Sequence, residues 1–368
     1  MSRLPHLLST AALGALRLPN RVLMAPMTRA RALEDGSVPP LVAEYFTQRA
    51  SAGLLLTDAV MPAPEAVGYP GMPGFWTDAQ SESWRAVVAA VHAAGGRIAV
   101  QLMHCGRLSL PAYQPRGEMP VSASPVRAAT TTLYSPRHVA EPAPEPRALD
   151  ISEIPGVVLQ FAAAAQRARE VGFDGVEIHA ADGSLLDQFL RDGVNRRHDR
   201  FGGSPDNRAR LLLQVTEAVA RVYGADRTGV RLSPLGTLND MHDGNPLETF
   251  GTAVRHLSSL RLAWTQISGE PGSDLTRRLR DIAAVPFVLT GGFTAELADA
   301  AIREELACAV SFGRPWIANP DLVDRFATGA ELAVPDASTF YGGGARGYTD
   351  YPVLERDSAT PVMQPQLL

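Results

Sequence analysis

Eight short apolar segments recur along the chain, and longer segments with a helical period lie between most of them. Nearly every position in a short segment is apolar, which is typical of parallel strands buried on both faces. The segments are 21–27, 53–59, 97–103, 175–180, 229–234, 263–268, 286–291 and 309–314. Eight strands alternating with helices predict an α/β protein built as a single (β/α)8, or TIM, barrel. An open doubly wound sheet is the alternative, but it usually has fewer strands and a glycine-rich turn after the first.

Four of the intervening segments carry helix start or stop signals. They are 81–96, 150–173, 204–224 and 294–306. The second opens with Asp150 or Ser152 followed by Glu153, and the third opens on Ser-Pro and stops at Gly224. Such residues are preferred where a helix begins or ends. We therefore expect each of these helices to follow a barrel strand.

The regular alternation of strands and helices is interrupted between the third strand and its helix. Residues 104–149 are rich in proline, and so long a connection inside a compact domain is usually functional. We expect this segment to form a capping insertion over the mouth of the barrel. The tail 332–368, rich in glycine and tyrosine at 340–352, should pack back on the barrel. With no repeat or linker, 1–368 is best described as one domain.

The composition and charge of the chain limit the classes of partner that it is expected to bind. The 368 residues are 45% hydrophobic and 20% charged, with a net charge of −5, which favours neither nucleic acid nor an anionic membrane surface. Cys105 and Cys308 are far apart and form no disulfide framework or zinc motif, so no metal is expected. No apolar run reaches the length of a membrane span, and no signal peptide is evident. These features favour a cytoplasmic enzyme, either monomeric or homodimeric.

In a TIM barrel the active site lies at the carboxyl ends of the strands. The polar residues expected there are Thr28, Asp58, Gln101, His104, Arg107, His179, Asp182, Arg231, Ser268 and Thr290. Glycines follow the last two strands, as Gly291, Gly292 and Gly313, and Arg314 comes next. Small residues and a fixed positive charge at these two strands suit a phosphate group. The pattern predicts a phosphorylated cofactor.

Several longer motifs strengthen that prediction. They include LPNRVLMAPMTR (18–29), VHAAGGRIAVQLMHCGR (91–107), GFDGVEIHAADGSLLDQFL (172–190), FGRPWIANPDL (312–322) and FYGGGARGYTDYP (340–352). Together they resemble the Old Yellow Enzyme family of FMN-dependent ene-reductases, and most closely its bacterial N-ethylmaleimide reductase-like members. The resemblance extends over nearly the whole chain. It implies a TIM barrel with bound FMN and with NADPH or NADH as the reductant.

The resemblance also assigns cofactor contacts. Thr28 would hydrogen-bond the flavin and tune its potential, while Gln101 and Arg231 would bind the pyrimidine edge. Arg231 would also stabilise negative charge on the reduced ring. The cofactor-binding set is Pro26, Thr28, Ala59, Gln101, His179, Arg231, Gly291, Gly292, Gly313 and Arg314. Its last four members would hold the phosphate.

The motif after the fourth strand departs from the family pattern. That pattern is His, two small residues, Asn or His, Gly and Tyr. The first and fourth positions donate hydrogen bonds to the substrate oxygen, and the Tyr donates a proton opposite the flavin hydride. His179 matches, but Asp182 replaces the second donor and Ser184 the Tyr. An ionised Asp cannot donate, and a Ser is a poor proton donor. With Thr28, these three form the candidate catalytic set.

The candidate substrate-binding residues are Tyr69, Met103, His179, Asp182, His242 and Tyr341. Met103 replaces the tryptophan usual in the family, and His242 lies in the loop after the fifth strand. The first hypothesis is NAD(P)H-driven reduction of an activated C=C in a small α,β-unsaturated compound. The second is a flavoenzyme that dehydrogenates or isomerises a specialised metabolite with Asp182 as base or counter-ion. The third is a flavin-binding protein without turnover.

Overall fold

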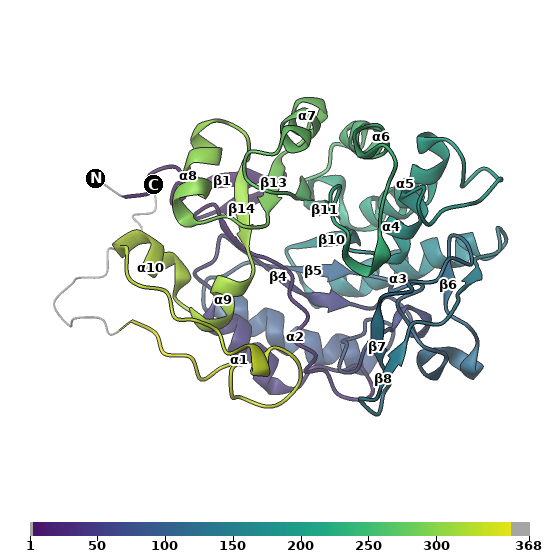
Figure 1. The fold of residues 1–368 in the computed structure, drawn as a ribbon. Coiled ribbons are helices and arrows are strands. Elements are labelled where there is room, and N and C mark those ends of the chain that lie inside the picture. Colours follow the sequence, from purple (N-terminus) through teal and green to yellow (C-terminus); the bar gives the residue numbers. More distant parts are fainter. Residues whose placement is uncertain (1–2, 355–368) are drawn as a thin grey trace.

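Eight parallel strands close into a barrel in the computed structural model, which describes residues 3–354 (Figure 1). The strands, in order around the barrel, are β3 (Val22–Met24), β4 (Leu54–Val60), β5 (Ile98–Leu102), β10 (Gly175–Ala180), β11 (Thr228–Leu232), β12 (Trp264–Ser268), β13 (Phe287–Thr290) and β14 (Ala309–Phe312). Each overlaps one predicted apolar segment. The predicted TIM barrel is therefore confirmed, and the doubly wound sheet is wrong.

Helices surround the barrel. They are α1 (Pro40–Gln48), α2 (Asp78–Ala93), α3 (Ile154–Val171), α4 (Leu185–Leu190), α5 (Pro205–Tyr223), α6 (Pro246–Ser259), α7 (Asp274–Ile282), α8 (Ala295–Arg303), α9 (Arg314–Ala318) and α10 (Leu322–Thr328). Helix α2 begins before the predicted start because Thr77 and Gln80 form a capping box. Helix α3 begins after its predicted start, and its N-cap residue is Glu153. The Glu153 side chain does not cap the helix but accepts two hydrogen bonds from Arg147.

A short hairpin seals the amino-terminal end of the barrel, a feature that the sequence analysis did not identify. It pairs β1 (Ala11–Leu13) with β2 (Leu16–Leu18). Its leucines pack against apolar residues from the barrel interior, among them Leu54, Trp264 and Val288. The amino-terminal end of the barrel is therefore filled by apolar side chains, which leaves the carboxyl end as the open side.

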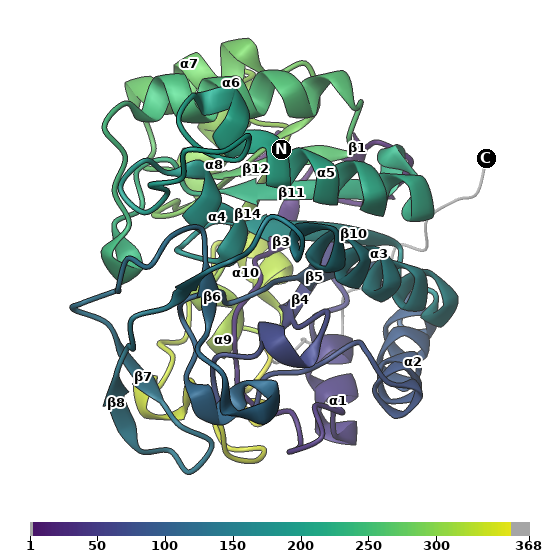
Figure 2. The ribbon, with the colours of Figure 1, turned by 90° about the vertical axis from the view of Figure 1, so that its right-hand side faces the viewer.

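The long connection between β5 and α3 contains two small sheets. One pairs β6 (Val121–Ser122) with β9 (Arg147–Ala148), and the other is the hairpin of β7 (Thr132–Tyr134) and β8 (Ala140–Pro142). Figure 2 shows this hairpin beside the barrel, next to the chain that follows α10. Three of its residues, Thr132, Tyr134 and His138, line the cavity described below.

The described part of the tail contacts the connection between β3 and α1. Tyr348 stacks on Tyr45 with ring centroids 3.9 Å apart, and the Arg29 guanidinium lies over both rings. Arg29 also donates hydrogen bonds to the carbonyl groups of Phe340 and Gly347. The rest of the predicted tail, 355–368, lies outside the described residues. Within 3–354, no helix combines the length and apolar character needed to cross a membrane.

Candidate active site

A cavity of about 630 Å³ opens at the carboxyl end of the barrel. It is lined by most of the residues predicted to bind cofactor or substrate, namely Pro26, Thr28, Ala59, Tyr69, Gln101, Met103, His179, Asp182, Ser184, Arg231 and Tyr341. They come from the ends of five neighbouring strands, from the β4–α2 connection and from the tail. The fold thus brings together residues that are more than 300 positions apart in the chain.

The predicted phosphate-binding residues lie at the ends of β13 and β14 and do not line this cavity. Gly291 and Gly292 are exposed and have positive φ angles of 108° and 68°, so a side chain there would be strained. A Cβ on Gly291 would also lie 3.1 Å from the carbonyl oxygen of Gly269. Gly313 and Arg314 follow β14, and Arg314 is exposed.

His242 is not brought to the cavity. It is exposed and packs against Gly193, where a Cβ would lie 2.5 Å from its ring. From the same loop, Leu238 and Asn239 line the cavity instead. His242 is the only titratable ring in this loop, which is why it was predicted, whereas the turn before it was not predicted. Asn239 and Asp240 both adopt positive φ, and an Asn-Asp pair was the available signal for such a turn.

An irregularity in β4 positions two site residues. The pairing of β4 with β5 shifts between Leu56 and Ala59, so that Ala59 lies opposite Gln101. Thr57 and Asp58 thus stand against a single residue of β5, and the Asp58 carboxylate accepts a hydrogen bond of 2.7 Å from the backbone N–H of Arg29. Burial raises the pKa of Asp58 to about 6, despite this bond. The β-bulge thereby fixes the connection that carries Thr28.

His179 ends β10 with its ring buried. Burial lowers the pKa of His179 to about 4, and the positive charge of Arg231 adds to this effect. The imidazole is therefore neutral at physiological pH, with one donor and one acceptor nitrogen. Its Nδ1 atom is buried and has no hydrogen-bond partner among the described residues. A buried polar atom without a partner on a cavity wall is suited to contact a ligand.

Asp182 forms an ion pair in the cavity. Its Oδ2 atom lies 3.1 Å from Nη2 of Arg231, and the two side chains are 30% and 14% exposed. Asp182 adopts a positive φ of 55°. Its backbone N–H donates to the Ser233 hydroxyl at 2.8 Å, and its carbonyl accepts from the Asn239 amide at 2.7 Å. These bonds hold a strained turn so that an acceptor group faces the cavity.

Ser184 is not placed as a proton donor. Its hydroxyl donates to the backbone carbonyl of His179 at 3.1 Å, and the residue is 2% exposed. It also precedes α4 as the N-cap residue. Ser184 therefore supports the end of β10, although it contributes to the cavity wall.

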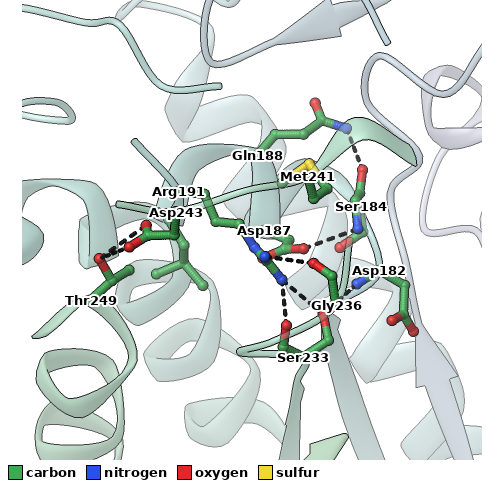
Figure 3. Close-up of polar contacts among 12 residues, drawn as sticks. Asp182, Ser184, Asp187, Gln188, Arg191, Ser233, Gly236, Met241, Asp243 and Thr249 are labelled. Atoms are coloured by element: carbon green, nitrogen blue, oxygen red, sulfur yellow. Dashed lines mark hydrogen bonds and ion pairs between the residues drawn. The ribbon is translucent and has the colours of Figure 1, made fainter. Parts of the chain in front are cut away.

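A buried network of hydrogen bonds and one ion pair holds the turn between β10 and α4 in place (Figure 3). Asp187 accepts a hydrogen bond from the N–H of Gly183 and forms an ion pair of 2.8 Å with Arg191. Arg191 in turn donates to the carbonyl groups of Ser233 and Gly236. The turn that carries Asp182 is thus joined to the segment after β11 through fully buried charges.

The barrel interior beside the cavity offers further unpartnered polar atoms. His179, Arg231 and Gln266 are in register on β10, β11 and β12, and Ser311 lies on β14. Nε of Arg231, the whole amide group of Gln266 and the hydroxyl of Ser311 are buried and have no hydrogen-bond partner within residues 3–354. These donors and acceptors fit a polar cofactor with a heteroaromatic ring and hydroxyl groups. Together with the exposed glycines after β13, they are compatible with FMN.

The sequence pattern of the NADH:flavin oxidoreductase / NADH oxidase family matches residues 7–333. The chain belongs to this family. Its members include the Old Yellow Enzymes, so the resemblance found in the sequence is confirmed. The chain is accordingly an FMN-dependent oxidoreductase that uses NAD(P)H and is of the ene-reductase type.

The similarity extends over whole chains. The protein is 42% identical over 365 residues to 12-oxophytodienoate reductase 7 of Oryza sativa subsp. japonica, covering 92% of both chains. It is 40% identical over 389 residues to the flavin oxidoreductase hxnT of Emericella nidulans, covering 96% of this chain and 99% of that one. The structure of morphinone reductase in complex with tetrahydroNAD has a TM-score of 0.93 and 44% identity, covering 96% and 99%. The Zymomonas mobilis Old Yellow Enzyme homologue has a TM-score of 0.91 and 41% identity, covering 95% and 99%.

The buried Asp187–Arg191 pair can be tested against a matched exposed pair. Asp187→Ala should lower the free energy of unfolding by about 3–5 kcal/mol, because it leaves a buried arginine without its counter-charge. Asp274 and Arg278 have the same i,i+4 spacing and the same 2.8 Å distance, but are 79% and 58% exposed. Asp274→Ala should cost less than about 1 kcal/mol. Equal losses in urea denaturation would contradict a special role for the buried pair.

Proposed function

We propose that this protein uses NADH or NADPH to reduce an activated carbon–carbon double bond of a small α,β-unsaturated compound. The observation that supports it most is the meeting of Thr28, Gln101, His179 and Arg231 in one cavity at the carboxyl ends of the strands. The resemblance gives these residues to the flavin and the substrate oxygen. Cytoplasmic location and a monomeric or homodimeric state remain predictions of the sequence.

The chain offers separate groups for the two ends of the cofactor. Pro26, Thr28, Ala59, Gln101 and Arg231 would hold the ring, since all of them line the cavity. Gly291, Gly292, Gly313 and Arg314 would hold the phosphate, because they combine close backbone approach with a positive charge. FMN, when bound, supplies the hydride for the reduction.

The substrate would lie against His179, between the aromatic rings of Tyr69 and Tyr341. As a neutral imidazole, His179 can donate one hydrogen bond to the carbonyl or nitro oxygen and so polarise the double bond. Met103 contributes apolar surface where the family has tryptophan. Asp182, ion-paired with Arg231, is an acceptor and does not supply the second donor of the family pattern.

The proposed function is tested by mixing the enzyme with NADH or NADPH in a stopped-flow spectrophotometer and then adding an enone. We expect the flavin absorbance to bleach and then to return as the enone is reduced. Reduction of the flavin by a saturated ketone or an amine, without reoxidation by the enone, would support dehydrogenation with Asp182 as base. A flavin inert to every reagent would support the non-catalytic alternative.

The two arginines assigned to the cofactor should have distinct effects. Arg314→Ala should weaken FMN binding by about tenfold to a hundredfold, since a charged hydrogen bond to phosphate is lost, and should leave the reduction potential nearly unchanged. Arg231→Ala should shift the potential, because its charge lies at the ring. Arg278→Ala, an exposed arginine on α7, is the control. An FMN affinity unaffected by Arg314→Ala would refute the phosphate assignment.

Ser184→Ala distinguishes support from proton donation. Because the Ser184 hydroxyl is bonded to the His179 carbonyl, we expect kcat for alkene reduction to fall less than about tenfold, with the same pH profile. Loss of a group that transfers the proton costs about a hundredfold to ten-thousandfold. A loss of that size, with a changed pH profile and an unchanged FMN content, would show that Ser184 does donate the proton.

A further inference from the structure

The carboxylate of Asp182 has one oxygen left for a ligand. Oδ2 is paired with Arg231, while Oδ1 accepts no hydrogen bond from the described residues. The side chain is 30% exposed and lines the cavity. The position of Asp182 is fixed by two hydrogen bonds, one from its backbone N–H to the Ser233 hydroxyl and one from the Asn239 amide to its backbone carbonyl. Asp182 therefore presents a charged acceptor toward the substrate.

His179 lies three residues before Asp182 and lines the same cavity. Its neutral ring provides a hydrogen-bond donor to a substrate oxygen, and its Nδ1 has no partner among the described residues. The two side chains are close enough for the carboxylate to raise the pKa of His179 against the effect of burial. One donor and one acceptor thus stand where the family pattern has two donors.

We propose that this donor–acceptor pair selects substrates whose activating carbonyl is bonded to an N–H group, as in unsaturated cyclic imides and lactams. The carbonyl oxygen accepts from His179, and the adjacent N–H donates to Oδ1 of Asp182. A substrate without the N–H leaves the carboxylate facing a carbonyl oxygen or a methyl group, which costs affinity. This inference rests on the proposed function and names its substrate class.

The reduction itself is unchanged by this selection. The C=C bond gains one hydride and one proton: NAD(P)H supplies the hydride through the flavin and becomes NAD(P)+, water supplies the proton, and the substrate N–H is retained. A cationic amine fits the pair less well. Its charge would lie beside the Arg231 guanidinium, which is 3.1 Å from the same carboxylate, whereas a neutral N–H meets no such repulsion.

The test compares maleimide with N-methylmaleimide, which differ only in the nitrogen substituent, a hydrogen in one and a methyl group in the other. For the wild-type holoenzyme we expect kcat/KM to be about tenfold to a hundredfold higher for maleimide, as expected for one hydrogen bond to a charged group. In Asp182→Asn the amide can turn to donate or accept, so the ratio should fall to within about threefold. Asn tolerates positive φ well, so the variant should fold. FMN content is measured in parallel because Asp182 contacts Arg231.

Binding provides a second measurement, independent of turnover. Succinimide and N-methylsuccinimide are titrated against the oxidised holoenzyme, and the Kd is read from the change in flavin absorbance. Succinimide should bind about tenfold or more tightly in the wild type, and the preference should disappear in Asp182→Asn. Asp226→Asn is the matched control, because Asp226 is exposed and lies before β11, at the opposite end of the barrel.

Maleimides also alkylate thiols, so the two cysteines need a control. Cys105 lines the cavity but is buried, and burial raises its pKa to about 12, which keeps the reactive thiolate scarce. Cys308 is partly exposed. The Cys308→Ser variant should show the same substrate ratio, and mass spectrometry of the protein after each assay measures any alkylation.

The outcomes separate the two proposals. If neither maleimide nor a simple enone is reduced, the proposed function fails. If N-methylmaleimide is reduced as fast as maleimide by the wild type, ene-reduction stands and the selection by Asp182 is wrong. The same conclusion follows if Asp182→Asn keeps the wild-type preference.

Discussion

Closure of eight parallel strands is the constraint on which the rest of the structure depends. In a closed barrel every strand must end at the same rim, so residues as distant in the chain as Thr28 and Arg231 meet there. The β1–β2 hairpin and the apolar interior block the other end. The open, polar end of the barrel is therefore the carboxyl side, where His179, Arg231 and Gln266 form a row across three strands.

The strands were the most predictable part of the fold, because parallel strands buried on both faces leave continuous apolar runs. Strand β10 was predicted with its observed bounds. The β1–β2 hairpin was missed because its strands have three residues each, too few to show a period. Pro-rich segments carry no period either, so the sequence could indicate a long connection at 104–149 without revealing that Tyr134 and His138 would reach the cavity.

The candidate site was predictable where residue type decides the role and less so where tertiary contacts do. Gln101 and Arg231 follow from strand position and resemblance. The role of Ser184 depends on which carbonyl its hydroxyl meets, and that of Asp182 on the 3.1 Å contact with Arg231. The first contact depends on how the chain turns over five residues, and the second joins residues 49 positions apart, so a sequence pattern reveals neither. The departure at Asp182 thus has its counter-charge in Arg231, a residue that the resemblance assigns to the flavin.

One small loop after β11 gives the cavity a mechanical property. Asp240 accepts hydrogen bonds from the N–H and the hydroxyl of Thr130 in the connection between β5 and α3, while the adjacent Asn239 donates to the backbone carbonyl of Asp182. Arg107 donates to the carbonyl groups of both Asn239 and Asp240. The connection between β5 and α3 is thus joined through this loop to the turn that carries Asp182. A displacement of the residues around Thr130 would therefore be transmitted through Asn239 and Asp240 to the backbone that positions the Asp182 carboxylate.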